Sequence, residues 1–165
     1  MWSMFLIALS LIHQQTTLVI GDSEARYINR QVQNYSSIFE KIEVDAEGGT
    51  TIQRWGEQGK LKQVLTQHKR PDTIIIFLGT NNHWNKTLPN LVPIFDQIKD
   101  IKCIWVGPTA VNAKKWQLNQ LLKQEIAKSH CQYIDTEELD IPLEDGWHPT
   151  NVGITKWLNY IWSVK

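Results

Sequence analysis

The sequence predicts a single α/β domain, a three-layer α/β/α sandwich of the flavodoxin-like type with a central parallel sheet. Apolar, β-branched stretches alternate with amphipathic stretches, which is typical of a parallel sheet covered by helices on both faces. The run T-I-I-I-F-L at 73–78 is apolar after its first residue, as expected for a strand buried on both faces. We find no internal repeat and no interdomain linker, so one domain over residues 14–165 is the simplest interpretation.

The predicted strands are short apolar runs that end at turn-forming residues. The first contains L-V-I and ends at Gly21, and the third is preceded by Pro71-Asp72 and ends at Gly79. Gly107-Pro108 follows the fourth. Glycine and proline at these places favour chain reversal. The expected strands are 18–20, 41–44, 73–78, 101–106 and 131–134.

The predicted helices lie between these strands, where apolar residues recur every three or four positions. A turn-rich loop, A-E-G-G-T-T at 46–51, follows the second strand, and Pro71 limits the second helix. A loop and a helix are expected over 23–39, and the other expected helices are 60–68, 91–99, 113–129 and 150–164.

The overall charge argues against some classes of partner. Lys and Arg together number 17, as do Asp and Glu, so the formal net charge is zero. Without a basic stripe or a block of like charges, the sequence does not predict binding to nucleic acid. A neutral chain favours uncharged substrates or surfaces.

Residues 1–13, M-W-S-M-F-L-I-A-L-S-L-I-H, form an apolar segment before the domain. The segment is shorter than the about 20 residues of a membrane-spanning helix, and it lacks the positive charges that begin a signal peptide. Three interpretations stay open: a signal peptide, an uncleaved anchor, or an added helix packed on the domain. The segment favours an extracytoplasmic or membrane-associated location, with membrane association through residues 1–12.

The chain has two cysteines, Cys103 and Cys131, each near the start of a predicted strand. They match no zinc-binding pattern, and we expect no metal and no cofactor. A disulfide in an oxidising compartment and two reduced, buried thiols are both compatible with their positions.

Four blocks of chemically suggestive residues follow the predicted strands. They are G-D-S at 21–23, G-G-T at 48–50, G-T-N-N at 79–82 and D-G-W-H-P at 145–149. Because active sites of open α/β sheets lie at the carboxyl ends of the strands, we expect the four blocks to converge at one edge.

The first and last blocks contain the three groups that acyl transfer by a serine requires. Ser23 is the candidate nucleophile, His148 the base that takes its proton, and Asp145 the carboxylate that orients the imidazole. Asp145 and His148 lie three residues apart, close enough for a local hydrogen bond. Asp22, in contrast, is expected to hold the turn.

The middle blocks contain candidate donors to the oxyanion of the tetrahedral intermediate. We expect the backbone N–H groups of Ser23 and Gly49 and the side-chain amide of Asn81 to form this oxyanion hole. A glycine lets the backbone approach the substrate without an intervening Cβ. Gly48 is an alternative donor to Gly49.

The four blocks, in this order and across nearly the whole chain after residue 16, resemble those of the SGNH (GDSL-type) hydrolases. The resemblance implies the SGNH hydrolase fold and the roles given above for Ser23, Gly49, Asn81, Asp145 and His148. Two departures stand out. Asn82 replaces the aspartate often found after the asparagine of the family. E-A-R follows G-D-S in place of small or hydroxyl residues, which predicts a more charged pocket mouth.

These observations predict a serine esterase, and among its possible substrates they favour O-acetyl groups on carbohydrate. The short chain leaves little room for a long acyl tunnel, and Trp55, Trp84 and Trp147 lie near the motifs, where aromatic side chains could stack on sugars or pack against the sheet. Trp84, Trp147 and Asn82 are the candidate substrate-binding residues. A lysophospholipase or thioesterase-type lipid esterase is one alternative. A non-catalytic carbohydrate-binding or surface- or virion-associated module is the other.

Overall fold

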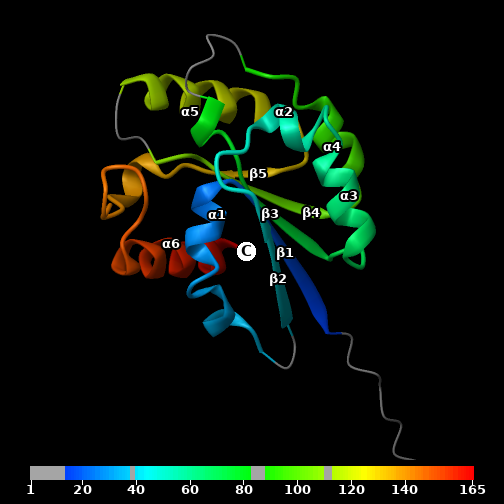
Figure 1. Ribbon diagram of the computed structural model, residues 1–165, viewed down its shortest axis with the longest axis horizontal. Coiled ribbons are helices and arrows are strands. Elements are labelled where there is room, and N and C mark those ends of the chain that lie inside the picture. Colours follow the sequence, from blue (N-terminus) through cyan, green and yellow to red (C-terminus); the bar gives the residue numbers. More distant parts are fainter. Residues whose placement is uncertain (1–13, 38–39, 83–87, 110–112) are drawn as a thin grey trace, which may run out of the picture.

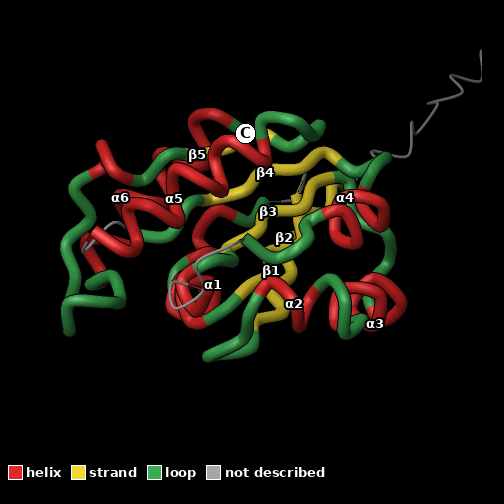
Figure 2. Tube along the Cα trace, turned by 90° about the horizontal axis from the view of Figure 1, so that it is seen from above, coloured by secondary structure: helices red, strands yellow, loops and turns green. Residues whose placement is uncertain are grey.

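The computed structural model describes residues 14–37, 40–82, 88–109 and 113–165, without the side chains of 113–116 and 138. The predictions for residues 1–13 and for Trp84 lie outside the described residues. The predicted parallel sheet is confirmed: it has five strands in the order β2-β1-β3-β4-β5, and all neighbouring pairs are parallel. Figure 2 shows the strands running through the middle of the molecule. The strands are β1 (Gln15–Gly21), β2 (Glu40–Ala46), β3 (Thr73–Phe77), β4 (Lys102–Val106) and β5 (Gln132–Ile134).

Helices cover both faces of the sheet, as the uninterrupted apolar strands require (Figure 1). Alternate strand residues point to opposite faces. Thus Leu18 and Ile20 pack toward α2, α3, α4 and α5, whereas Val19 packs toward α1 and α6. None of the helices in the described part of the chain is long and apolar enough to cross a membrane. The helices are α1 (Ser23–Ile28), α2 (Ile52–Trp55), α3 (Lys60–Gln67), α4 (Val92–Ile98), α5 (Ala113–Ile126) and α6 (Asn151–Val164).

The close contact between β1 and β3 explains the glycine of the G-D-S block. Gly21 has a φ of 153°, and a Cβ at this position would lie 2.1 Å from the carbonyl oxygen of Phe77. The next residue, Asp22, donates its backbone N–H to that same oxygen at 2.9 Å. Only glycine fits this combination of conformation and close approach.

Two local features differ from what the sequence predicts. Within 23–39, where a loop and a helix are expected, the helix comes first and ends at Ile28. The N–H of Asn29 donates to the carbonyl of Ala25 at 3.1 Å, and the N–H of Arg30 donates to the carbonyl of Tyr27 at 3.2 Å, which tightens the last turn. A short 3-10 helix, η1 (Val32–Tyr35), follows, because the chain must return to start β2 beside β1. The short helix α2 was not predicted.

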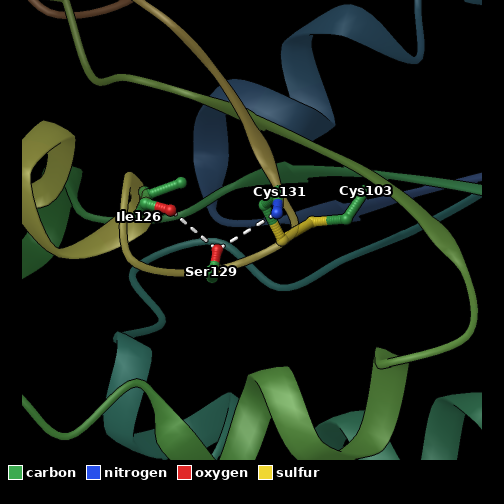
Figure 3. Close-up of a disulfide and its surroundings, with 4 residues drawn as sticks. All are labelled: Cys103, Ile126, Ser129 and Cys131. Carbon is green, nitrogen blue, oxygen red and sulfur yellow. Dashed lines mark hydrogen bonds between the residues drawn. A yellow bond between two sulfur atoms is a disulfide. The ribbon is translucent and has the colours of Figure 1, made fainter.

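The two cysteines form a disulfide, so the bonded alternative is the one present (Figure 3). Cys103 lies in β4 and Cys131 directly precedes β5, which is the neighbouring strand. The hydroxyl of Ser129 accepts from the N–H of Cys131 at 3.1 Å and donates to the carbonyl of Ile126 at 2.8 Å. These bonds fix the turn that brings Cys131 to Cys103.

Candidate active site

Ser23 is the first residue of α1, directly beyond the carboxyl end of β1. Asp22 is the N-cap residue, and its side chain accepts from the N–H of Glu24 at 2.9 Å. Asp22 therefore holds the turn, as expected. The backbone N–H of Ser23 belongs to the first turn of the helix, where N–H groups have no intrahelical acceptor. The turn thus presents both a hydroxyl and an N–H at the edge of the sheet.

His148 lies between the other two residues of the predicted triad. Its Nε2 is 3.1 Å from the Oγ of Ser23, and its Nδ1 is 2.7 Å from Oδ2 of Asp145. The two contacts use opposite nitrogens of one imidazole, so the ring can accept a proton at Nε2 while Nδ1–H stays bonded to the carboxylate. The structure therefore brings together Ser23, His148 and Asp145 from opposite ends of the chain.

The loop around His148 is closed on itself, which fixes the position of the imidazole. Leu143 and Pro149 form an antiparallel bridge, and the N–H of Glu144 donates to the carbonyl of His148 at 2.8 Å. Gly146 has a φ of 78°, a left-handed conformation that favours glycine at the tip of this loop. The glycine of D-G-W-H-P is thus explained by the turn that aligns the acid with the histidine.

Asp145 is held in its ionised form. The hydrogen bond from the His148 side chain lowers the pKa of Asp145 most. The backbone N–H groups of His148 and Trp147 add two hydrogen bonds to Oδ1, at 2.7 and 2.8 Å. Together these donors hold the pKa of Asp145 well below its usual range. A carboxylate that stays charged can support the imidazolium that forms when His148 takes a proton.

A second ring supports the imidazole from the face. The Tyr27 ring stacks on His148 with the centroids 4.3 Å apart and the planes 4° from parallel. The Arg30 guanidinium lies 4.1 Å from the Tyr27 centroid, a cation–π contact. Sequence analysis missed both residues, although Tyr27 follows Ser23 by four positions, the spacing that places two side chains on one face of a helix.

The glycine block forms a tight turn beside the triad. The N–H of Thr50 donates to the carbonyl of Glu47 at 3.2 Å, and Gly49 takes a φ of 76°. Asn81 donates one amide N–H to the carbonyl of Thr50 at 2.9 Å, which joins this turn to the loop after β3. Its second amide N–H has no acceptor among the residues that the structure describes.

Asn82 has a structural position, which corrects the prediction that it contacts substrate. Its side chain is only 1% exposed. Oδ1 accepts from the N–H of Ile52 at 3.0 Å, and Nδ2 donates to Gln53 at 2.8 Å. Asn82 therefore holds the start of α2. An amide is sufficient for these two contacts, although the SGNH block that this one resembles often has an aspartate here.

A cavity of about 630 Å³ opens beside Ser23 and His148. Trp147 is 40% exposed next to the triad, whereas Trp55 is fully buried in the core and cannot stack on a substrate. The cavity includes Gly48, the alternative oxyanion donor. Its lining is formed by Ser23, Arg26, Tyr27, Asn29, Arg30, Gly48 and His148.

Among the described residues, one cluster has side chains of the types that bind metals: Cys103, His130 and Cys131. Its two sulfur atoms are joined in the disulfide and are therefore not thiolate ligands. The cluster also lies near the amino ends of β4 and β5, at the edge of the sheet opposite Ser23.

Comparison with known proteins identifies the fold of the chain. No protein-family model and no curated protein matches the sequence. Among solved structures, a member of the lipolytic protein G-D-S-L family from Veillonella parvula superposes with a TM-score of 0.69 at 16% identity, over 91% of this chain and 97% of that one. This chain has the SGNH hydrolase fold.

Other proteins of the SGNH hydrolase fold give similar superpositions. An acetyl xylan esterase matches with a TM-score of 0.71 at 15% identity, over 90% of this chain and 98% of its own. A lipase/acylhydrolase from Enterococcus faecalis matches with a TM-score of 0.68 at 16% identity, over 91% and 94% of the two chains. Each of these superpositions covers most of both chains.

Proposed function

We propose that the protein is a serine esterase that hydrolyses carboxylic esters. The observation that carries this proposal is the chain of contacts from Ser23 through His148 to Asp145, with distances of 3.1 and 2.7 Å. A nucleophile, a base and an orienting acid within hydrogen-bonding reach are what acyl transfer requires. The SGNH hydrolase fold supports the same function.

In the first half of the reaction, Ser23 attacks the ester carbonyl carbon while His148 takes the hydroxyl proton at Nε2. The carbonyl electrons move onto the oxygen, where the N–H of Ser23, the turn at Gly48 and Gly49, and the second amide N–H of Asn81 are the proposed donors. Collapse of this intermediate breaks the bond to the alcohol, which leaves with the proton from His148.

In the second half, water replaces the alcohol. His148 takes a proton from the water, whose oxygen attacks the acyl group on Ser23. When the acyl bond breaks, His148 returns the proton to Ser23 and the carboxylic acid leaves. Throughout, the ionised Asp145 keeps the imidazole in one orientation and stabilises its charged form.

The direct test compares wild type with Ser23→Ala on 4-nitrophenyl acetate. We expect the variant to lose at least about 10³-fold in kcat, because the nucleophile is absent. A fluorophosphonate probe should label the wild type and leave the variant unlabelled. Wild-type protein that neither hydrolyses any ester nor reacts with the probe would instead support the non-catalytic binding module.

As a finer proposal, the substrate is an O-acetyl group on carbohydrate. The exposed Trp147 beside the triad supports this proposal, since indole rings stack on sugars. The lipid esterase is the alternative. Octanoate esters hydrolysed much faster than acetate esters would favour the lipid substrate, and acetate release from an acetylated polysaccharide would favour the sugar.

We also propose an extracytoplasmic location. The disulfide between Cys103 and Cys131 supports it, because disulfides persist mainly in oxidising compartments. Mass spectrometry of protein alkylated without prior reduction tests the proposal. Two alkylated cysteines in protein isolated from its native source would contradict it.

A further inference from the structure

One face of α1 lines the cavity. Arg26 and Tyr27 follow Ser23 by three and four positions, which places them on the same face of the helix, and Arg30 lies in the turn directly after it. All four residues line the same cavity. The opposite side of the helix is buried, as Ala25 and Ile28 belong to the core. The helix that carries Ser23 therefore presents the guanidinium of Arg26 beside it, and Arg30, in the turn after the helix, adds a second guanidinium to the lining.

Arg26 differs from the other three arginines of the chain. Arg30 lies 3.9 Å from Glu144, Arg54 lies 3.4 Å from Glu47, and Arg70 lies 3.2 Å from Asp100. For Arg26, no carboxylate forms an ion pair among the described residues. Its side chain is exposed and lines the cavity.

The nearest acid in sequence does not neutralise this charge. Glu24 is two residues from Arg26, but its side chain is only 1% exposed, on the buried side of the helix. Its Oε1 accepts from the backbone N–H and the hydroxyl of Thr109, at 3.3 and 3.2 Å. The charge of Arg26 is therefore directed at the cavity, in a protein whose net charge is zero.

We propose that the substrate is an anionic ester, and that Arg26 binds its negatively charged group. The inference rests on the proposed esterase function and deepens it. A guanidinium forms bidentate hydrogen bonds with a carboxylate or a phosphate. Arg30, partly neutralised by Glu144, adds a weaker positive charge at the rim. The zero net charge favours an uncharged substrate, but the local positive charge at the cavity favours an anionic one.

A carboxylate or a phosphate could supply this anion, and the two sources correspond to different substrates. An acetylated acidic sugar offers a carboxylate near the ester, and a lysophospholipid offers a phosphate. Two matched pairs of substrates separate them. The first pair is an O-acetylated methyl glucuronoside with its carboxylate free or converted to the methyl ester. The second is acetylglycerol 3-phosphate and acetylglycerol.

The measured quantity is the ratio of kcat/KM for the anionic member to that for the neutral member. We expect wild type to prefer one anionic member by about 10-fold or more, and Arg26→Gln to remove most of that preference, since a charged hydrogen bond is lost. Arg26→Lys should keep part of it. Arg70→Gln, which removes a paired arginine outside the cavity, is the matched control and should keep the wild-type ratio.

The outcomes separate the two proposals. Preference in the carboxylate pair supports an acidic sugar, and preference in the phosphate pair supports a lipid headgroup. An active enzyme with equal rates on both members of each pair overturns the anion proposal alone. So does an Arg26→Gln variant that slows both members equally, because Arg26 would then act on the ester itself. A wild type that hydrolyses no ester and resists the fluorophosphonate overturns the esterase as well.

Discussion

The imidazole of His148 is restrained on its edge and on its face. Asp145 binds Nδ1 on the edge of the ring, while Tyr27 stacks on the face. The remaining nitrogen, Nε2, is left to Ser23. A ring restrained in this way loses little freedom when it takes up a proton, which is the condition for efficient base catalysis. The geometry is therefore already organised for the proposed proton transfer.

Asp145→Asn tests the role of the charge at this position. We expect kcat to fall by about 10²–10⁴-fold, because an amide favours the wrong tautomer of His148 and cannot support the imidazolium. Steady-state kinetics on 4-nitrophenyl acetate measure the loss. Asp100→Asn, at an exposed carboxylate paired with Arg70, should retain wild-type kcat. Equal rates for wild type and Asp145→Asn would remove Asp145 from the mechanism.

The lowered pKa of Asp145 also gives an acid dependence of stability. Its pKa is lower in the folded protein than the ordinary 3.8, so the ionised group stabilises the fold above that pH. The stabilisation is lost as the pH falls below about 4 toward the folded pKa. Between pH 5 and 2, the wild type should therefore lose more in Tm than Asp145→Asn. Parallel curves for the two proteins would contradict this expectation.

At the scale of elements, the short helix α2 is held by contacts from other parts of the chain. Thr51, directly before the helix, is its N-cap residue, and the Thr51 hydroxyl accepts from the N–H of Arg54 at 3.4 Å. Asn82, from the loop after β3, binds Ile52 and Gln53. Because Asn81 donates to the carbonyl of Thr50, the same loop holds both the turn at Gly48 and Gly49 and the helix that follows it.

Asn82→Ala should destabilise the fold by about 1–3 kcal/mol, since the N–H of Ile52 would stay buried without an acceptor. Urea unfolding measures this loss. Asn82→Asp should cost less, because Asp keeps the acceptor and the Gln53 amide can turn its donor toward it. Asn90→Ala is the matched control, as Asn90 accepts from Val92 at an exposed site where water can replace it. Equal losses at both positions would refute the argument from burial.

At the scale of the whole molecule, the disulfide and the candidate active site lie at opposite edges of the sheet. The disulfide joins the amino-end regions of β4 and β5, and the triad lies beyond the carboxyl ends of the strands. β5 is a short edge strand that pairs with β4 alone. The disulfide therefore reinforces the weakest-paired strand of the sheet without approaching the reacting groups.

Replacing both cysteines with serine should lower the free energy of unfolding by about 3–4 kcal/mol, the loop-entropy expectation for this spacing. The sequence separation that sets this value is 28 residues. Chemical unfolding measures the loss, and kcat/KM of the folded variant should match wild type. A reductant should destabilise wild type and leave the double variant unchanged. Equal unfolding free energies for all samples would disprove a stabilising role.

The strands and the four blocks could be predicted because their information is local. An apolar run such as 73–78 must be buried, and glycines such as Gly21 follow the strand where the chain turns. The end of α1 could not be predicted, because it depends on where β2 must pair with β1. The stacking of Tyr27 on His148 is a contact between distant segments, which periodicity does not reveal.

The segment formed by α1 and the two residues after it has a buried side and a cavity side, and this division has an evolutionary consequence. Arg26, Asn29 and Arg30 are exposed, so exchanging them changes what the cavity attracts without disturbing the core. Descendants of this gene could therefore acquire new preferences through a few codon changes, while selection for a stable domain keeps Ala25 and Ile28. One short segment would thus let recognition diversify while the arrangement of Ser23, His148 and Asp145 is inherited intact.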